Sequence, residues 1–206
     1  MKIVKLHSNI SRATKEASRA LSRGALIVYP TDTCYGLGVN ALDKKAINKL
    51  YEVKKRSPHK PTHVVVRDWQ MIESLCRTND LAKRLYDKHL PGPLTIILKK
   101  KPHVPDELTG GLHTLGVRIP HHKFTQKLMG QVDFPITTPS ANEKGEPPPY
   151  SIDKVKEALD PKMIDLVIDA GKLTITPPST LVDVSENKLK ILRKGPVSKK
   201  GLLKDM

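Results

Sequence analysis

The chain has 206 residues and a formal net charge of +15, from 36 Lys and Arg against 21 Asp and Glu. Hydrophobic residues make up 38% of it, which is enough for a buried core and excludes an intrinsically disordered protein. No apolar run approaches the roughly 18 residues of a membrane span, and two cysteines are too few for a zinc ribbon or a disulfide scaffold. We therefore expect a single domain over residues 1–206, soluble and cytoplasmic, with no membrane partner. The positive charge favours a polyanionic partner, either a nucleotide or a nucleic acid.

Helices and strands are expected in alternation along the first third of the chain. Apolar residues at helical spacing predict a helix over residues 10–23, which leads into a strand at Ala25–Tyr29. Asp43 is placed to cap a second helix that runs to Val53. Prolines then exclude helix, so a buried strand is expected at His63–Val66.

The rest of the chain continues this alternation, but not strictly. Further strands are predicted at residues 94–98, 115–119, 134–138, 166–168, 180–184 and 189–192, and further helices near residues 80–89, 122–130 and 151–159. Only residues 185–188 join the last two strands, which is too short for a parallel crossover, so these strands must pair antiparallel. The predicted fold class is α/β, with a mixed sheet of parallel and antiparallel strands and flanking helices.

A loop rich in hydroxyl groups and glycines follows the first predicted strand, with the sequence YPTDTCYGLG at residues 29–38. Its glycines allow backbone amides to approach a ligand closely. Gly36, Gly38 and Ala41 also match the dinucleotide-binding pattern G-x-G-x-x-A. Six residues separate that pattern from the strand, however, whereas the fingerprint begins directly at the strand end. An oxidoreductase that binds a dinucleotide is therefore a minor alternative.

Cations gather in the loop after the second predicted helix, which contains no carboxylate. They are Lys54, Lys55, Arg56, Lys60 and Arg67. Prolines stiffen this loop, which we expect to be exposed and to bind phosphate, although a merely solvated charged face is the alternative. A further arginine, Arg118, lies in an otherwise apolar strand with no acid nearby in the sequence, so a ligand carboxylate is its expected partner.

Small hydroxyl and amide side chains lie at other strand ends. The segment TTPSAN at residues 137–142 is suited to donate hydrogen bonds to a carboxylate or phosphate, or else forms only a local turn. Ser179 begins one of the last two strands and Arg193 ends the other, so antiparallel pairing places them at neighbouring ends. No residue set resembles a nucleophile with its base, and the eight histidines lack metal-ligand spacing. We therefore predict a site that positions anions, with no metal held by protein side chains.

Five motifs occur in order along the chain: YPTDTCYGLG, KKRSPHKP, LPGPLT with TLGVRIP, TTPSAN, and PSTLVD followed by ILRKGPVS. Together they resemble the YrdC family, the threonylcarbamoyl-AMP synthases, over about residues 10–198. The resemblance implies the family's fold, a twisted mixed α/β domain with a positively charged concave face. It also implies the family's reaction, a nucleotidyl transfer in which L-threonine, bicarbonate and ATP give L-threonylcarbamoyladenylate and pyrophosphate.

The resemblance further implies which residues bind each substrate. Those around the threonine and carbamate end are Thr31, Arg118, Thr138 and Ser179. Those around ATP are Lys54, Arg56, Thr114, Ser140, Asn142 and Arg193. Lys54, Arg56 and Arg118 are expected to act by charge and position, with no general base. The sequence departs from the family at Pro61-Thr62-His63, where many members have Leu before a His, so His63 is left out of the predicted site.

The resemblance also implies partners. Mg²⁺ is expected to arrive with ATP and to be held mainly by the triphosphate. A partner enzyme is expected to pass the threonylcarbamoyl group to the tRNA adenosine beside the anticodon. The alternative from another class is a non-catalytic, translation-associated protein that binds tRNA or double-stranded RNA through its basic face. Hydroxyl groups at the strand ends favour the small-molecule pocket over backbone binding to RNA.

Overall fold

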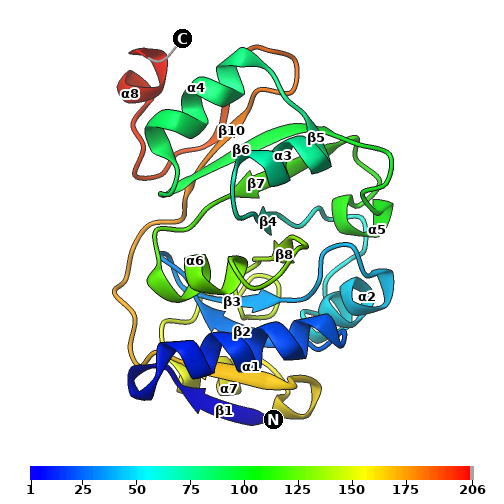
Figure 1. Cartoon of the computed structure of the whole chain (residues 1–206), viewed down its shortest axis with the longest axis vertical. Helices are drawn as coiled ribbons and strands as arrows, with labels where there is room; N and C mark the ends of the chain where they lie inside the picture. Colours follow the sequence, from blue (N-terminus) through cyan, green and yellow to red (C-terminus); the bar gives the residue numbers. More distant parts are fainter. Residues whose placement is uncertain (205–206) are drawn as a thin grey trace.

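The computed structural model describes residues 1–204, which form two β-sheets with helices packed around them (Figure 1). The smaller sheet has the strand order β1–β9–β2–β3 and lies in the lower half of Figure 1. Its strands are β1 (Lys2–Lys5), β2 (Ile27–Pro30), β3 (Tyr35–Gly38) and β9 (Leu166–Asp169). Strands β1, β9 and β2 are parallel, and β3 runs antiparallel to β2.

The larger sheet has seven strands, in the order β11–β10–β6–β7–β4–β8 with β5 paired to β6 outside that path. Its strands are β4 (Val64–Val65), β5 (Cys76–Arg77), β6 (Leu94–Lys100), β7 (Thr114–Arg118), β8 (Ile136–Thr137), β10 (Thr180–Asp183) and β11 (Lys190–Arg193). Strand β10 is parallel to β6 and β4 is parallel to β7, while the other neighbouring pairs are antiparallel. Isolated bridges from Gly36 to Ser140 and from Asn40 to Ile136 connect the two sheets.

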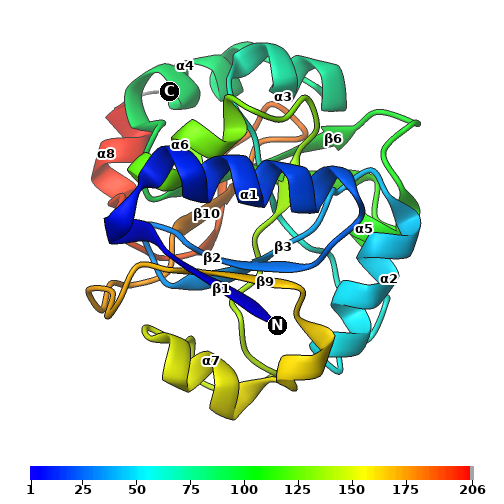
Figure 2. The same ribbon diagram turned by 60° about the horizontal axis from the view of Figure 1, so that its bottom comes forward.

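Helices pack against both sheets. They are α1 (Ile10–Ser22), α2 (Lys44–Val53), α3 (Trp69–Leu75), α4 (Asp80–His89), α5 (Asp106–Thr109), α6 (Lys123–Met129), α7 (Ile152–Ala158) and α8 (Lys199–Lys204), with 3-10 turns at Leu6–Ser8 and Pro161–Met163. Helices α1 and α6 pack on one face of the smaller sheet, and α7 lies on its other side (Figure 2). Between residues 1 and 204, no helix combines the length and the hydropathy that crossing a bilayer requires.

The helices that the sequence pattern predicts are confirmed in α1, α2, α4, α6 and α7. Asp43 caps α2 as expected, accepting hydrogen bonds from the backbone N–H groups of Lys45 (2.9 Å) and Ala46 (3.2 Å). The antiparallel pairing of β10 with β11 is also confirmed. The predicted fold class, α/β with mixed parallel and antiparallel strands and flanking helices, is confirmed, and the strands divide into two such sheets. Division lets each sheet bury its apolar face against a shared core.

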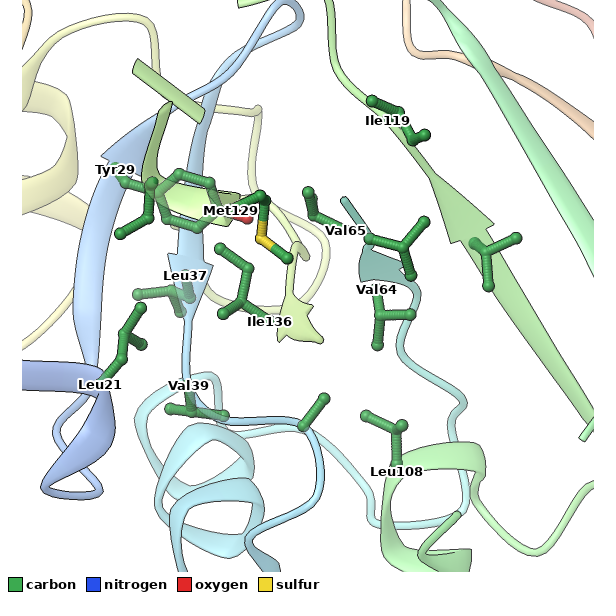
Figure 3. Packing of buried hydrophobic residues seen from close by; sticks show 14 of the residues in the cluster. Leu21, Tyr29, Leu37, Val39, Val64, Val65, Leu108, Ile119, Met129 and Ile136 are labelled. Atoms are coloured by element: carbon green, nitrogen blue, oxygen red, sulfur yellow. The ribbon is translucent and has the colours of Figure 1, made fainter. Parts of the chain in front are cut away.

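The hydrophobic core is one cluster that runs between the two sheets (Figure 3). On one side, Tyr29 and Leu37 come from the smaller sheet, and on the other Val64 and Val65 come from β4. Ile136 of β8 lies between them. All five side chains have no solvent exposure, so this packing fixes how the loops at the junction of the sheets face each other.

Candidate functional site

A cavity of about 440 Å³ opens where the two sheets meet. Its walls come from the β2–β3 loop, the segment after α2, the ends of β7 and β11, and the segments beside β8 and β10. Most of the residues predicted to bind substrate line it: Arg56, Arg118, Thr138, Ser140, Asn142, Ser179 and Arg193. A larger groove of about 1230 Å³ beside α7 contains none of them.

Strand register brings three of these residues to one edge of the larger sheet. Arg118 ends β7, which is antiparallel to β6, so it lies beside the start of β6. Strand β10 is parallel to β6, so Ser179 at its start lies at the same edge. Strand β11 is antiparallel to β10, and its last residue, Arg193, returns to that edge. Residues separated by many positions in sequence therefore face one cavity.

Ser179 and Arg193 are in direct contact, as the antiparallel pairing predicts. Arg193 donates from Nε to the Ser179 carbonyl oxygen (3.1 Å) and from Nη2 to Ser179 Oγ (3.2 Å). Ser179 Oγ also shares a hydrogen bond with Thr95 Oγ1 (2.8 Å). Burial, with the charge of nearby Arg118, lowers the pKa of Arg193, but a guanidinium remains charged at neutral pH.

Arg118 pairs with Asp32, an acid that is distant in the sequence but close in the fold, and the ligand carboxylate expected from the sequence stays a prediction. Arg118 Nη2 donates to Asp32 Oδ1, and the two side chains are only 7% and 12% exposed. Asp32 lies in the β2–β3 loop, 86 residues earlier in the chain, so only the fold brings the pair together. Arg118 Nε is buried and has no partner, which leaves the guanidinium a donor for a ligand anion.

Lys54 is buried, which corrects the expectation that the whole cation-rich loop is exposed. The residue is 3% exposed and does not line the cavity. Its Nζ donates to the carbonyl oxygens of Ser140 (2.5 Å) and Asn142 (2.6 Å). Burial, together with the charge of Arg56, lowers the pKa of Lys54 to about 8. Lys54 thus holds the cavity-lining segment 140–142 in place through its backbone.

Two other predicted residues also lie outside the cavity lining. Thr31 is buried just after β2, where its Oγ1 donates to the carbonyl oxygen of Cys34 (2.8 Å) and accepts from the backbone N–H of Thr33 (3.2 Å). This hydroxyl therefore closes the turn that carries Thr33 and Cys34 to the cavity. Thr114 begins β7, at the opposite end of the strand from Arg118 and roughly 13 Å from it at the usual rise of a strand. The substrate roles assigned to Thr31 and Thr114 remain predictions.

His63 lines the cavity, although it was left out of the predicted site. It precedes β4, and its ring lies against Gly116 so closely that a Cβ there would be 2.5 Å from His63 Cδ2. Burial and the charges of Arg193, Arg118 and Arg56 lower the pKa of His63 to about 4. At neutral pH the His63 side chain therefore lines the cavity as a neutral imidazole. The sequence signal that could have identified His63 is its position at the border of an apolar strand.

The segment 170–179, orange on the left of Figure 1, crosses from the smaller sheet to the larger one and closes one side of the cavity. Thr176 Oγ1 donates to the carbonyl oxygens of Asp32 and Thr33, both at 3.2 Å. Tyr150 donates from its hydroxyl to the Thr176 carbonyl oxygen (3.3 Å). No sequence motif marks Tyr150 or Thr176, because their place in the wall depends on these tertiary contacts.

The lining of the cavity is suited to an anionic, polar ligand. Among the described residues, those that line it include three arginines, Arg56, Arg118 and Arg193, and one carboxylate, Glu146. Four buried polar atoms of the residues that line it have no hydrogen-bond partner: Arg56 Nε, Arg118 Nε, Thr138 Oγ1 and Asn142 Oδ1. An unsatisfied buried polar atom costs about 1–3 kcal/mol. A ligand that pairs with several of them recovers that cost, so the geometry favours a bound anion with several polar groups.

These features define an α/β protein with a cation-lined cavity between two mixed sheets. The model of the Sua5/YciO/YrdC family, whose description reads "Telomere recombination", matches residues 19–195. The chain therefore belongs to this family.

Individual relatives resemble the chain over most of its length. A protein of Methanocaldococcus jannaschii is 40% identical over 201 residues, covering 95% of this chain and 94% of that protein. The threonylcarbamoyl-AMP synthase of Pyrococcus abyssi is 38% identical over 180 residues, covering 87% of this chain but 53% of that enzyme. A crystal structure of P. abyssi Sua5 in complex with L-threonine superposes with a TM-score of 0.91 at 33% identity, covering all of this chain and 60% of that one. The chain thus spans nearly all of the first relative and about half of the second.

Proposed function

We propose that the protein is an L-threonylcarbamoyladenylate synthase, which converts L-threonine, bicarbonate and ATP to threonylcarbamoyl-AMP and pyrophosphate. The observation that carries the proposal is the cavity, whose described lining residues include three arginines and one carboxylate, and in whose lining residues four buried polar atoms lack partners. Threonine and ATP both present anionic groups that such a wall stabilises. The name of the P. abyssi relative and the threonine bound in the Sua5 crystal support the same reaction.

The unpaired atoms suggest how the substrates are divided. Arg118 Nε and Thr138 Oγ1 are suited to a carboxylate and a hydroxyl, so we assign them with Ser179 to the threonine and carbamate end. The atoms that remain are suited to ATP and belong to the segments after α2 and β8. We assign to ATP the residues Arg56, Ser140, Asn142 and Arg193. Lys54 and Thr31 act through the segments that they hold.

The reaction proceeds in two steps in this proposal. The threonine amino group adds to the carbon of bicarbonate and water leaves, giving a carbamate. A carbamate oxygen then attacks the α-phosphorus of ATP, and pyrophosphate leaves with the electron pair of the broken P–O bond. Because nucleophile and phosphate are both negatively charged, catalysis depends on holding them in line and offsetting their repulsion. The guanidinium groups supply that charge, and the carbamate needs no general base once formed.

Mg²⁺ accompanies ATP in this proposal. Glu146 is the one carboxylate among the described cavity-lining residues. Residues 1–204 contain no cluster of three His, Cys, Asp or Glu side chains placed to hold a metal ion. This donor set fits an ion held mainly by phosphate oxygens and water, with Glu146 as the protein group available to it. The ion would neutralise charge on the phosphates, as it does in other phosphoryl transfers.

The product also implies a partner. A threonylcarbamoyl group joined to AMP is a mixed anhydride, which is reactive toward amines and toward water. The reaction that consumes it must therefore be a transfer of the threonylcarbamoyl group, and we propose a tRNA-modifying enzyme as the receiver. Direct binding of tRNA or double-stranded RNA, without catalysis, is the alternative that the net charge of +15 leaves open.

The test is pyrophosphate release by the purified protein in the absence of tRNA. We expect release only when L-threonine, bicarbonate, ATP and Mg²⁺ are all present. Serine should support markedly less release, because its missing methyl group removes about 1–3 kcal/mol of contact, and valine should support none, because it lacks the hydroxyl. Release that ignores threonine, or no release while RNA binds with a steep salt dependence, would contradict the proposal.

A further inference from the structure

The Asp32–Arg118 ion pair connects the two sheets beside the cavity. Asp32 lies in the β2–β3 loop of the smaller sheet, and Arg118 ends β7 of the larger sheet. Both side chains are largely buried, at 12% and 7% exposure. Arg118 lines the cavity and Asp32 does not, so Asp32 acts on any ligand through Arg118.

The Asp32 carboxylate is fixed from more than one direction. Its Oδ1 accepts from Arg118 Nη2, and its Oδ2 accepts from the backbone N–H of His121 (3.2 Å). The Asp32 backbone is held as well, because Thr176 Oγ1 donates to its carbonyl oxygen (3.2 Å). A carboxylate anchored in this way presents one oxygen to the guanidinium at a set position.

The contacts of Arg118 leave a defined part of the guanidinium for a ligand. Nη2 is engaged by Asp32, and Nη1 has only a long contact of 3.5 Å to Thr33 Oγ1. Nε is buried without a partner. An arginine side chain free to rotate would lose rotamer entropy when it binds a carboxylate. Asp32 prevents that loss by holding the guanidinium in one orientation beforehand.

We propose that Asp32 is a positioning residue, which ties Arg118 across the junction of the two sheets so that its remaining donors face the carboxylate of the amino-acid substrate. This inference rests on the proposed function and deepens it. Charge alone predicts the opposite effect, because a second carboxylate next to Arg118 repels an incoming anion. The sign of the effect of removing Asp32 therefore separates the two roles.

The experiment compares Asp32→Asn and Asp32→Ala with the wild type in the pyrophosphate-release assay, titrating threonine at saturating ATP and then ATP at saturating threonine. We expect Asp32→Asn to raise the KM for threonine about tenfold, the effect of replacing a charge-assisted hydrogen bond with a neutral one, with the KM for ATP changed less than about twofold. Asp32→Ala, which removes the acceptor altogether, should raise the KM for threonine further. The asparagine variant keeps the side-chain volume, so it keeps the comparison available if the alanine variant does not fold.

Asp165→Asn is the matched control. Asp165 Oδ2 likewise accepts from a cation, Lys49 Nζ (2.6 Å), and from a backbone N–H, that of Leu26 (2.7 Å), but it does not line the cavity. We expect this variant to lower the melting temperature while both KM values stay within about twofold of wild type, because it removes the same kinds of contact elsewhere.

The outcomes separate the inference from the function on which it rests. An active wild type together with an unchanged or lowered KM for threonine in Asp32→Asn would overturn the positioning role alone. Equal rises in the KM values for threonine and ATP would show that Asp32 is only a general stabilising contact. The same conclusion would follow if Asp165→Asn raised the KM for threonine as much as Asp32→Asn does. Either result would also overturn the positioning role. A wild-type protein that releases no threonine-dependent pyrophosphate would overturn the proposed function, and the inference with it.

Discussion

A substitution at Arg118 should weaken the binding of threonine much more than the binding of ATP. A lysine at this position has a single ammonium group, which cannot both pair with Asp32 and present a fork of donors to the cavity. We expect Arg118→Lys to weaken threonine binding at least about tenfold and ATP binding much less. Calorimetric titration of each substrate measures both. Loss of ATP affinity with threonine affinity intact would mean that the two ends of the site have been exchanged.

Replacing the buried Lys54 should destabilise the protein more than replacing its exposed neighbour, Lys55. In Lys54→Met two backbone carbonyl oxygens lose their ammonium donor, and we expect a loss of about 2 kcal/mol in the free energy of unfolding. The control is Lys55→Met, because the Lys55 ammonium is exposed and pairs with Glu143 at the surface (2.7 Å), where such pairs contribute little. Urea denaturation of both variants makes the comparison. Equal losses would show that Lys54 is not a structural clamp.

Burial also makes the contribution of Lys54 to the free energy of unfolding depend on pH. Its pKa is lowered to about 8 in the folded protein, against 10.5 for an ordinary lysine. Between these values the unfolded chain binds more protons at this residue, so its contribution to stability rises as pH rises from 8 toward 10.5 and is lost as pH falls. We expect the stability gap between wild type and Lys54→Met to widen over that interval, as measured by thermal unfolding. A gap that narrows would contradict the lowered pKa.

At the scale of single elements, β7 supports the cavity through Gly116. An alanine there would place its Cβ 2.5 Å from the His63 ring, so either the ring or the strand must move. We expect Gly116→Ala to cost about 1–3 kcal/mol in the free energy of unfolding, and much of that cost to be recovered in the double variant with His63→Ala. Gly130→Ala is the control, because the nearest atom to its added Cβ is 3.5 Å away and its φ is not in the left-handed region. No coupling between the two positions would contradict the contact.

The elements that the sequence predicted are those with a repeating pattern. Helices such as α1 and α4 repeat their apolar residues over several turns and were found. Strand β3 was missed, because its sequence YGLG looks like a glycine loop and becomes a strand only by pairing with β2. Helix α5, of four residues, is too short to show a period. Short elements are set by tertiary pairing, which a local pattern does not contain.

At the scale of the whole molecule, the sequence predicted which side chains line the cavity. It was less successful in predicting which of them contact each other. The Ser179–Arg193 contact followed from strand pairing alone. The Asp32–Arg118 pair could not be predicted, because it depends on the packing of two sheets. The buried position of Lys54 was missed for a related reason, since lysine is rarely buried and only the carbonyl groups of a distant segment make it tolerable here.

The most direct test of the proposed reaction is to identify its product. Purified protein is incubated with ATP, Mg²⁺, L-threonine and ¹³C-bicarbonate in the absence of tRNA, and the nucleotides are analysed by mass spectrometry. The structure predicts an adenylate that contains both threonine and one labelled carbon, located in the carbamoyl group, and no such species when any one substrate is omitted. An adenylate of threonine without the label, or no adenylate under any of these conditions, would contradict the assignment of this cavity to threonylcarbamoyl-AMP synthesis.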